Sequence, residues 1–156
     1  MKDELRLVPR TREEVRASID AMDASVKAQL SADWLALFRD SSAQDPWVHG
    51  FNVLHPDFGA VGLGAFKGPP RDGVVEIAYA IVPEHQRKGY ATQVARALFE
   101  YAAASGQVRS VIAHALPTSS ASQRVLAKAG FTFVGEFVDP EDGPVWRYDR
   151  TLQPGA

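Results

Sequence analysis

The chain has 156 residues, and 46% of them are hydrophobic, which is enough to fill one core. The formal net charge is −2, with 17 basic and 19 acidic residues interspersed, so no positive field exists for nucleic acid or an anionic membrane. The absence of cysteine excludes disulfides, thiolate metal sites and a cysteine nucleophile. No apolar run approaches the roughly 20 residues that span a bilayer, and no apolar leader follows the first residues. We therefore expect one cytoplasmic domain over residues 1–156.

The N-terminal part predicts a short strand and two helices. Residues 5–8 alternate like a strand, and the segment from Thr11 to Glu14 forms a capping box that begins a helix. The apolar stripe of this helix is expected to contain Val15, Ile19, Met22 and Val26. Ser31 is placed to cap a second helix, whose inner side carries Trp34, Leu35 and Phe38.

The middle of the chain predicts three strands. Residues 48–54 and 60–66 alternate with a period of two and are separated by a turn. Gly62 and Gly64 match neither a dinucleotide fingerprint nor a P-loop, so we interpret them as strand glycines. The strongest strand is 74–82, where Glu76 lies on a face of small residues.

The second half alternates helices and strands. A helix is expected from about residue 91 to Gly106, followed by a strand at 108–116 and a helix that Gly130 ends. Two last strands follow at 131–138 and 145–148, and residues 150–156 predict a loose tail. The expected fold is therefore α+β, with a mixed sheet of about six to seven strands flanked by about four helices.

The segment between the strongest strand and the next helix predicts a phosphate site. Residues 86–92 are Gln-Arg-Lys-Gly-Tyr-Ala-Thr. The first N–H groups of a helix have no intrahelical partner and lie at the positive end of its dipole, so they bind anions. Gly89 would let the backbone approach a pyrophosphate without a Cβ in the way. The alternative is an ordinary helix start.

Residues 86–91 resemble the Q/R-x-x-G-x-G/A acetyl-CoA signature of the GNAT superfamily of N-acetyltransferases. Residues 74–83 resemble the fourth strand of that family. Residues 121–131 resemble the A-S-x-R-V-L-x-K-x-G-F segment of its ribosomal-protein and small-amine branch. The resemblance implies a single GNAT-like domain that uses acetyl-CoA and releases CoA.

The resemblance also implies the cofactor contacts. A backbone N–H of Ile81 or Val82 would bind the oxyanion, next to the pantetheine. The other expected contacts are Arg87, Lys88, Gly89, Tyr90, Ala91, Thr92, Ser119, Ser122 and Arg124. Ser119 stands where many relatives have asparagine, and its alternative role is a helix cap. The alternative for Arg124 is a solvated helix face.

The implied reaction is direct transfer to a primary amine in a ternary complex. Glu76 is the candidate base, because it is the one carboxylate inside the strongest strand. Its alternative is a structural carboxylate paired with a neighbouring Arg or Tyr. In many relatives a tyrosine acts as the acid at the position where this chain has Leu126. Tyr148, with Tyr79 and Tyr90, is a reserve candidate for the acid, and the alternative for each is a packing aromatic with a satisfied hydroxyl. A thiol with a pKa of roughly 8.5 can also leave without strong acid catalysis.

The expected acceptor is a small-molecule amine or a peptide N-terminus, chosen in this family by loops that correspond to residues 27–31 and 139–144. Three acids on the second loop would attract a cationic amine: Asp139, Glu141 and Asp142. Four aromatic residues could line an apolar part of the pocket, or else belong to the core: Trp34, Phe38, Trp47 and Phe51. A homodimer would cover exposed strand edges.

The histidines at positions 49, 55, 85 and 114 lack the spacing of a helical metal pair, so we expect no metal site. His114 either touches substrate or is a hydrogen-bonded core or edge histidine. Two other functions stay open at this point. One is a catalytically silent acyl-CoA-binding sensor or interaction domain, and the other is a nucleotide-binding switch that uses the same turn for ATP or GTP.

Overall fold

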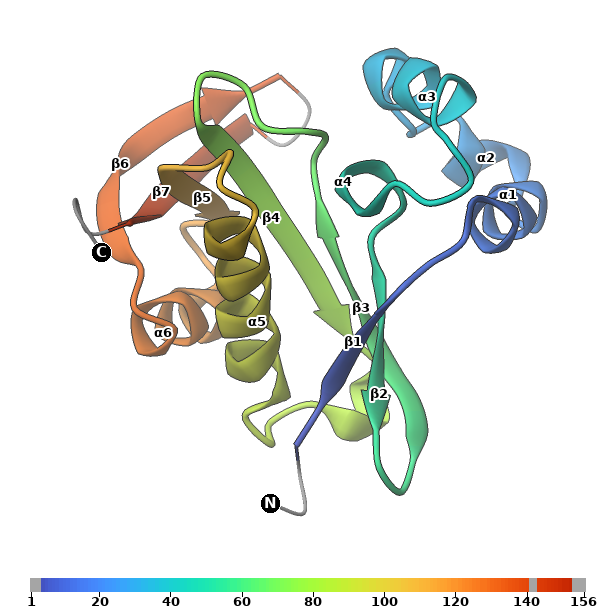
Figure 1. Ribbon diagram of the computed structural model, residues 1–156. Helices are drawn as coiled ribbons and strands as arrows, with labels where there is room; N and C mark the ends of the chain where they lie inside the picture. Colours follow the sequence, from blue (N-terminus) through green and yellow to red (C-terminus); the bar gives the residue numbers. More distant parts are fainter. Residues whose placement is uncertain (1–3, 141–142, 153–156) are drawn as a thin grey trace.

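The computed structural model describes residues 4–140 and 143–152, which form one sheet with helices on both sides (Figure 1). The seven strands are β1 (Arg6–Pro9), β2 (Phe51–His55), β3 (Gly59–Phe66), β4 (Val74–Ile81), β5 (Ser110–Ala115), β6 (Thr132–Asp139) and β7 (Gly143–Thr151). The helices are α1 (Arg12–Asp20), α2 (Ala24–Lys27), α3 (Ala32–Arg39), α4 (Pro46–His49), α5 (Tyr90–Ala104) and α6 (Ser120–Lys128), with a 3₁₀ turn, η1 (Pro83–His85). None of these helices is long and apolar enough to cross a membrane.

The sheet has the strand order β1-β2-β3-β4-β5-β7-β6. Its central neighbours, β4 and β5, are parallel, and the other described pairs are antiparallel. Parallel neighbours need a crossover, which α5 supplies. The predicted α+β fold with a mixed sheet is therefore confirmed, and the two helices beyond the expected four, α2 and α4, have four residues each.

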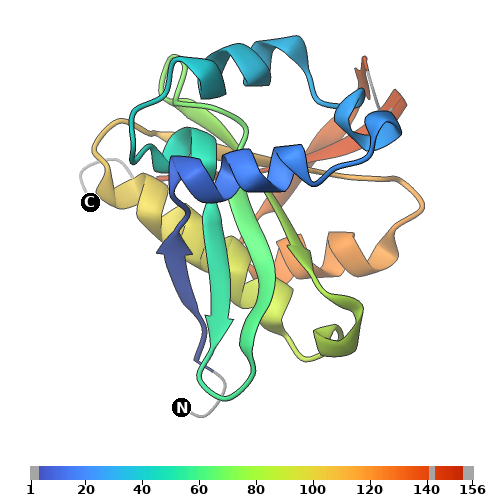
Figure 2. The same cartoon turned by 90° about the vertical axis from the view of Figure 1, so that its right-hand side faces the viewer.

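The main core lies between the sheet and α5. Val94, Ala95 and Leu98 of α5 are fully buried, as the predicted helical stripe requires. Gly64 faces this helix from β3, and a Cβ there would lie 3.2 Å from a methyl carbon of Val94. Gly64 is therefore a strand glycine that allows close packing. Figure 2 shows α5 running behind β1, β2 and β3, with α1 across one end of these strands.

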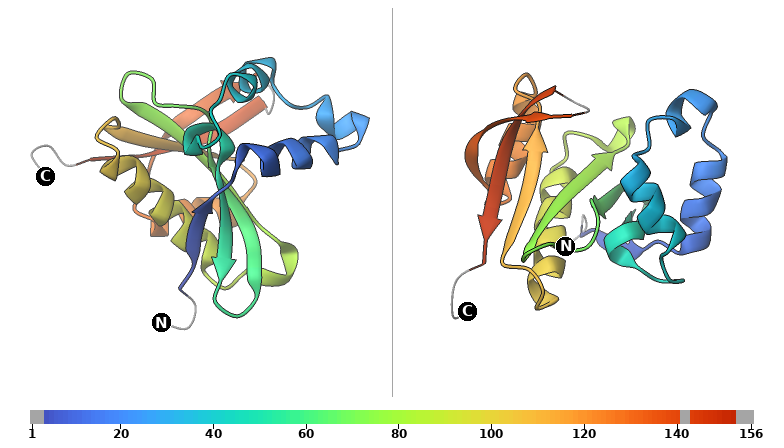
Figure 3. Two further views of the ribbon diagram at one scale, coloured as in Figure 1. Left: turned by 45° about the vertical axis from the view of Figure 1, so that its right-hand side comes forward. Right: turned by 90° about the horizontal axis from the view of Figure 1, so that it is seen from above.

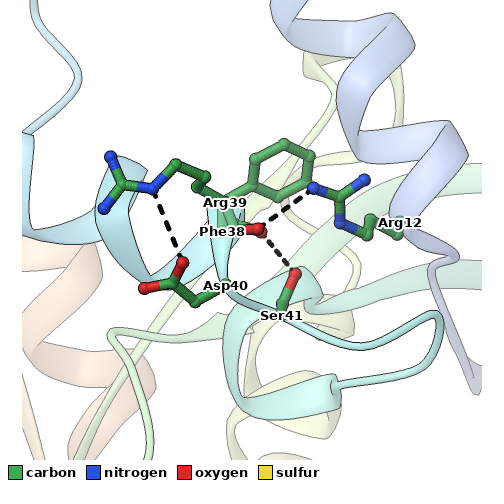
Figure 4. Close-up of polar contacts among 5 residues, drawn as sticks. All are labelled: Arg12, Phe38, Arg39, Asp40 and Ser41. Atoms are coloured by element: carbon green, nitrogen blue, oxygen red, sulfur yellow. Dashed lines mark hydrogen bonds and ion pairs between the residues drawn. The ribbon is translucent and has the colours of Figure 1, made fainter.

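A second, smaller core holds α1, α3 and α4 together at one side of the sheet, away from α5 and α6 (Figure 3). Phe38 stacks on Trp34 with ring centroids 5.6 Å apart, and the Arg12 guanidinium carbon lies 4.9 Å from the Phe38 ring centroid. The Ser41 hydroxyl donates to the Phe38 carbonyl at 2.6 Å, which closes the end of α3 (Figure 4).

The aromatic residues proposed for the acceptor pocket are core residues. Trp34 and Phe38 belong to the smaller core, and Trp47 and Phe51 pack around Phe66 in the main core. These contacts support the core alternative, and the role of the four rings in an acceptor pocket stays a prediction. The hydrophobic effect favours the burial of such large rings.

Three predicted boundaries are also wrong. The first helix ends at Asp20, because Asp23 accepts the Val26 N–H and begins α2, which leaves Val26 43% exposed. The strand expected from residue 48 begins at Phe51, since Pro46 at the first position starts α4 and Gly50 ends it at φ +72°. Strand β7 continues to Thr151, so the tail does not begin at 150; residues 153–156 lie outside the described part of the chain.

Candidate functional site

The two central strands separate at one end. They pair over Val74–Ile77 and Ser110–Ala113, and beyond this register the described residues of β4 and β5 are not paired with each other. A cavity of about 190 Å³ lies at this separation. It is lined by Lys67, Glu76, Ile77, Ala78, Tyr79, Ala113, His114, Ala115, Leu116, Ser122 and Val145. The sheet therefore has an opening at its centre.

Backbone groups of β4 point into this opening. The Lys67 N–H bonds to the Glu76 carbonyl, and the Val82 N–H bonds to the Val61 carbonyl, each at 2.9 Å. The backbone N–H and C=O groups of even-numbered residues of β4 therefore point toward β3. Because direction alternates along a strand, the N–H groups of Tyr79 and Ile81 face the side of β5. Of the two predicted oxyanion donors, Val82 is already bonded within the sheet, and Ile81 faces the opening.

A row of charged and polar side chains borders the cavity on the Glu76 face of the sheet. Glu76 Oε2 lies 2.9 Å from Lys67 Nζ and 2.9 Å from His114 Nδ1. Arg147 Nε lies 2.9 Å from His114 Nε2 and donates to it. A guanidinium can only donate, so Nε2 accepts and the imidazole proton is on Nδ1, which donates to Glu76. Arg147 also lies 3.9 Å from the Phe137 ring centroid.

Glu76 and His114 are bonded neighbours at this cavity. Each lines the cavity, and each is held by partners. The partners of Glu76 are Lys67 and His114, rather than the Arg or Tyr of the structural alternative. The side chains of Glu76 and His114 are 19% and 12% exposed, so water screens the contact between these two residues only in part.

The predicted phosphate turn has the backbone of an anion site. Arg87 and Gly89 both have left-handed conformations, at φ +65° and +83°. Gly89 is the N-cap of α5 and has no side chain to cap it, and the Gln86 amide bonds to the Ile81 carbonyl at 2.8 Å, which holds the turn against β4. A Cβ on Gly89 would meet nothing within 4 Å among the described residues. Successive N–H groups in such a turn form a concave site for an anion.

The other predicted cofactor residues divide into two groups. Arg87 and Lys88 are exposed, Ala91 and Thr92 are half-buried in the first turn of α5, and Ser122 lines the cavity. By contrast, Tyr90 is 2% exposed with its ring against His55, so only its backbone faces the turn. Ser119 is the N-cap of α6, as its alternative predicted, and donates to Ser122 Oγ at 2.9 Å. Arg124 is exposed on α6.

Tyr148 is not brought to the site. It pairs with Ala113 on the opposite face of the sheet from Glu76, packs against Phe133, and is 7% exposed. Tyr79 does line the cavity, and burial raises its pKa to about 12, so its hydroxyl stays protonated. Leu126 is 1% exposed in the core.

Sequence reasoning missed Lys67 and Arg147. Lys67 follows the last residue of β3, and the pairing of Phe66 with Ile77 places it directly across from Glu76. A hairpin register drawn from the sequence could have found it. Arg147 reaches His114 only because β7 pairs with β5, a contact between segments far apart in the chain.

Comparison with known proteins identifies relatives of this fold. The family model described as an acetyltransferase (GNAT) domain matches residues 3–132. A curated relative, the uncharacterized N-acetyltransferase YjdG of Bacillus subtilis (strain 168), is 30% identical over 99 residues; the match covers 60% of this chain and 59% of the relative. The chain thus matches less than two thirds of that relative's length.

Two solved structures share the fold. One is RimL, a ribosomal L7/L12 alpha-N-protein acetyltransferase in complex with coenzyme A, with a TM-score of 0.70, 17% identity, and coverage of 95% of this chain and 94% of that one. The other is the aminoglycoside acetyltransferase AAC(6')-Ib in complex with coenzyme A and kanamycin, with a TM-score of 0.66, 20% identity and 95% coverage of both chains.

Proposed function

Because the chain belongs to the GNAT acetyltransferase family, whose members use acetyl-CoA, we propose that it is an N-acetyltransferase that passes an acetyl group directly to a primary amine. The observation that carries this proposal is the opening between β4 and β5, where outward-facing backbone N–H groups and the Glu76 carboxylate border one cavity. Acetyl-CoA would supply the acetyl thioester. The protein itself would bind and orient the two substrates and would accept a proton from the amine.

The proposed cofactor contacts lie at the turn before α5 and along β4. The turn at Arg87, Lys88 and Gly89, with the first N–H groups of α5, would hold the diphosphate by hydrogen bonds and charge. The pantetheine chain would pass along β4 in the position that a neighbouring strand would otherwise occupy. The Ile81 N–H would donate a hydrogen bond to it. Ser122 would contact it from α6.

The oxyanion donor must lie near the base. A strand rises about 3.3 Å per residue, so Tyr79 lies about 10 Å from Glu76 along β4, and Ile81 lies about 16 Å from it. The Tyr79 N–H, which faces the same opening, is therefore better placed for the oxyanion, while the Ile81 N–H suits the pantetheine. A fixed N–H donor needs no reorganisation when negative charge develops, which is why it stabilises a transition state effectively.

Glu76 is the proposed base, acting directly or through one water. It must take the proton of the acceptor amine, and the His114 N–H would stabilise the carboxylate orientation at 2.9 Å. Arg147 fixes His114 in the tautomer that donates to Glu76. The thiol of CoA needs no strong acid to leave, which agrees with Leu126 being a core residue and Tyr148 lying on the other face.

The acceptor is proposed to be a small-molecule amine or a peptide N-terminus. By their descriptions, RimL acetylates a ribosomal protein and AAC(6')-Ib acetylates aminoglycosides. Asp139, the first residue of the proposed acceptor loop, is the last residue of β6, whereas Glu141 and Asp142 fall outside the described residues. A second copy of the chain could cover the edge strand β6, where Val138 is 81% exposed.

Turnover and binding together test the proposal. Acetyl-CoA and CoA, but not ATP, should raise the melting temperature, and a panel of amines should include an acetylated product. Glu76→Gln should lower kcat about a hundredfold without changing the shift with CoA. Glu100→Gln, at an exposed site on α5, is the matched control and should change neither.

Three results would redirect the proposal. Binding of CoA without turnover of any amine would indicate the silent acyl-CoA sensor, which is motivated by Leu126 and Ser119 at positions where polar residues are expected. A shift with ATP and magnesium would indicate a nucleotide switch. No shift at saturating acetyl-CoA would mean that the turn at residues 86–92 is only a helix start.

A further inference from the structure

The Lys67 ammonium lies beside the proposed base. Its Nζ is 2.9 Å from Glu76 Oε2, and Lys67 and Glu76 both line the cavity. A lysine ammonium has the chemistry of the primary amines that the proposed reaction would acetylate. The protein therefore places one of its own amines where the acceptor amine would meet the proposed base.

This placement is built into the fold. The Lys67 N–H bonds to the Glu76 carbonyl at 2.9 Å, so Lys67, directly after β3, lies across from Glu76 on β4. Cross-strand neighbours on one face are close enough for their side chains to meet. The Lys67 side chain is 50% exposed, whereas Glu76 is 19% exposed and bonds to His114.

We propose that Lys67 is a site of self-acetylation: in the absence of another acceptor, its amine takes the acetyl group of bound acetyl-CoA. This inference rests on the proposed function. Glu76 Oε2 accepts a proton from the ammonium, and the neutral Nζ attacks the acetyl carbonyl carbon. A C–N bond forms, the C–S bond breaks, and CoA leaves as a thiolate. The amide nitrogen loses its second proton, so the products are N-acetyl-lysine, CoA thiol and one proton.

Acetylation would change the site that performs it. The amide is neutral, so the Lys67–Glu76 ion pair is lost, while the His114 bond to Oε2 stays. An incoming amine would then find a carboxylate that no ammonium of the chain occupies. The unmodified lysine would instead compete with it, since both present the same charged group to the same oxygen.

The test uses purified full-length protein and acetyl-CoA, with no added amine. Peptide mass spectrometry over time should find acetyl groups at Lys67 about a hundredfold faster than at Lys27 and Lys128, which are exposed away from the cavity. Glu76→Gln should slow the reaction at Lys67 and leave the two control lysines unchanged. Lys67→Arg, which keeps the charge, should abolish the fast phase while CoA still raises the melting temperature.

Two outcomes are distinguishable. Equal slow acetylation of Lys67 and the control lysines, in protein whose melting temperature CoA raises, would overturn self-acetylation and leave the proposed function intact. Absence of any shift with CoA would instead contradict the cofactor site on which both proposals rest.

Discussion

Replacing Gly89 with alanine separates two roles of one glycine. At φ +83°, an alanine is in the left-handed region, which costs about 1–2 kcal/mol for an L-residue with a Cβ. For a chain of this length, that loss lowers the melting temperature by about 2–8 °C. The new methyl group would meet nothing within 4 Å in the described part of the protein, so it adds no clash of its own.

The effect on cofactor binding should be larger. The Cβ would project into open space beside the N–H groups that are proposed to bind the diphosphate. Losing one hydrogen bond to a charged group costs about 1.5–3 kcal/mol, or at least about a tenfold loss of affinity. At a CoA concentration of 100 times the original Kd, the stabilisation of about 2.7 kcal/mol should therefore fall by about half or more.

Gly106→Ala is the matched control. Gly106 follows the other end of α5, has φ +75°, and also has no atom of the described residues within 4 Å of a Cβ position. Both variants should lose similar stability, and Gly89→Ala alone should show a reduced shift with CoA, as measured by thermal unfolding and titration calorimetry. Equal CoA affinity in the two variants would refute the assignment of the turn as the diphosphate site.

Three further variants test the site and the core. Arg147→Met should lower kcat several-fold without changing CoA binding, because it removes the donor that fixes the His114 tautomer; unchanged kcat with a cognate amine would show that the tautomer is irrelevant. Leu126→Ala should lower the free energy of unfolding by about 2–5 kcal/mol in urea, since the side chain is 1% exposed, and a change below 1 kcal/mol would contradict a core role. Burial lowers the pKa of His49 in the folded protein below its usual value of 6.5. As the pH drops through about 6.5, His49 of the unfolded chain therefore takes up a proton that the folded protein does not, and the free energy of unfolding should fall. His49→Gln should flatten this dependence, and an equally steep pH profile in that variant would exclude His49 as its source.

Local patterns in the sequence were sufficient for several features. The capping box at Thr11 and Glu14, the cap at Ser31 and the buried stripe of α5 are confirmed. Each depends on residues within one or two turns of the same element. The left-handed Gly89 at the start of α5 has the same local origin, because the need for φ > 0 arises within the turn itself.

Features that depend on distant segments were decided only by the tertiary structure. The chain encodes Trp34 and Phe38 as aromatic residues on a helix, and only packing decides that they face a core rather than a pocket. Tyr148 and Arg147 are neighbours in sequence, yet the alternation of β7 sends one to the core and the other to His114. The row from Lys67 to Arg147 exists because the order β3-β4-β5-β7 brings four segments to one face of the sheet. Local sequence patterns predicted the type of most elements, but which side chains meet depends on register and strand order, which are set by contacts across the whole chain.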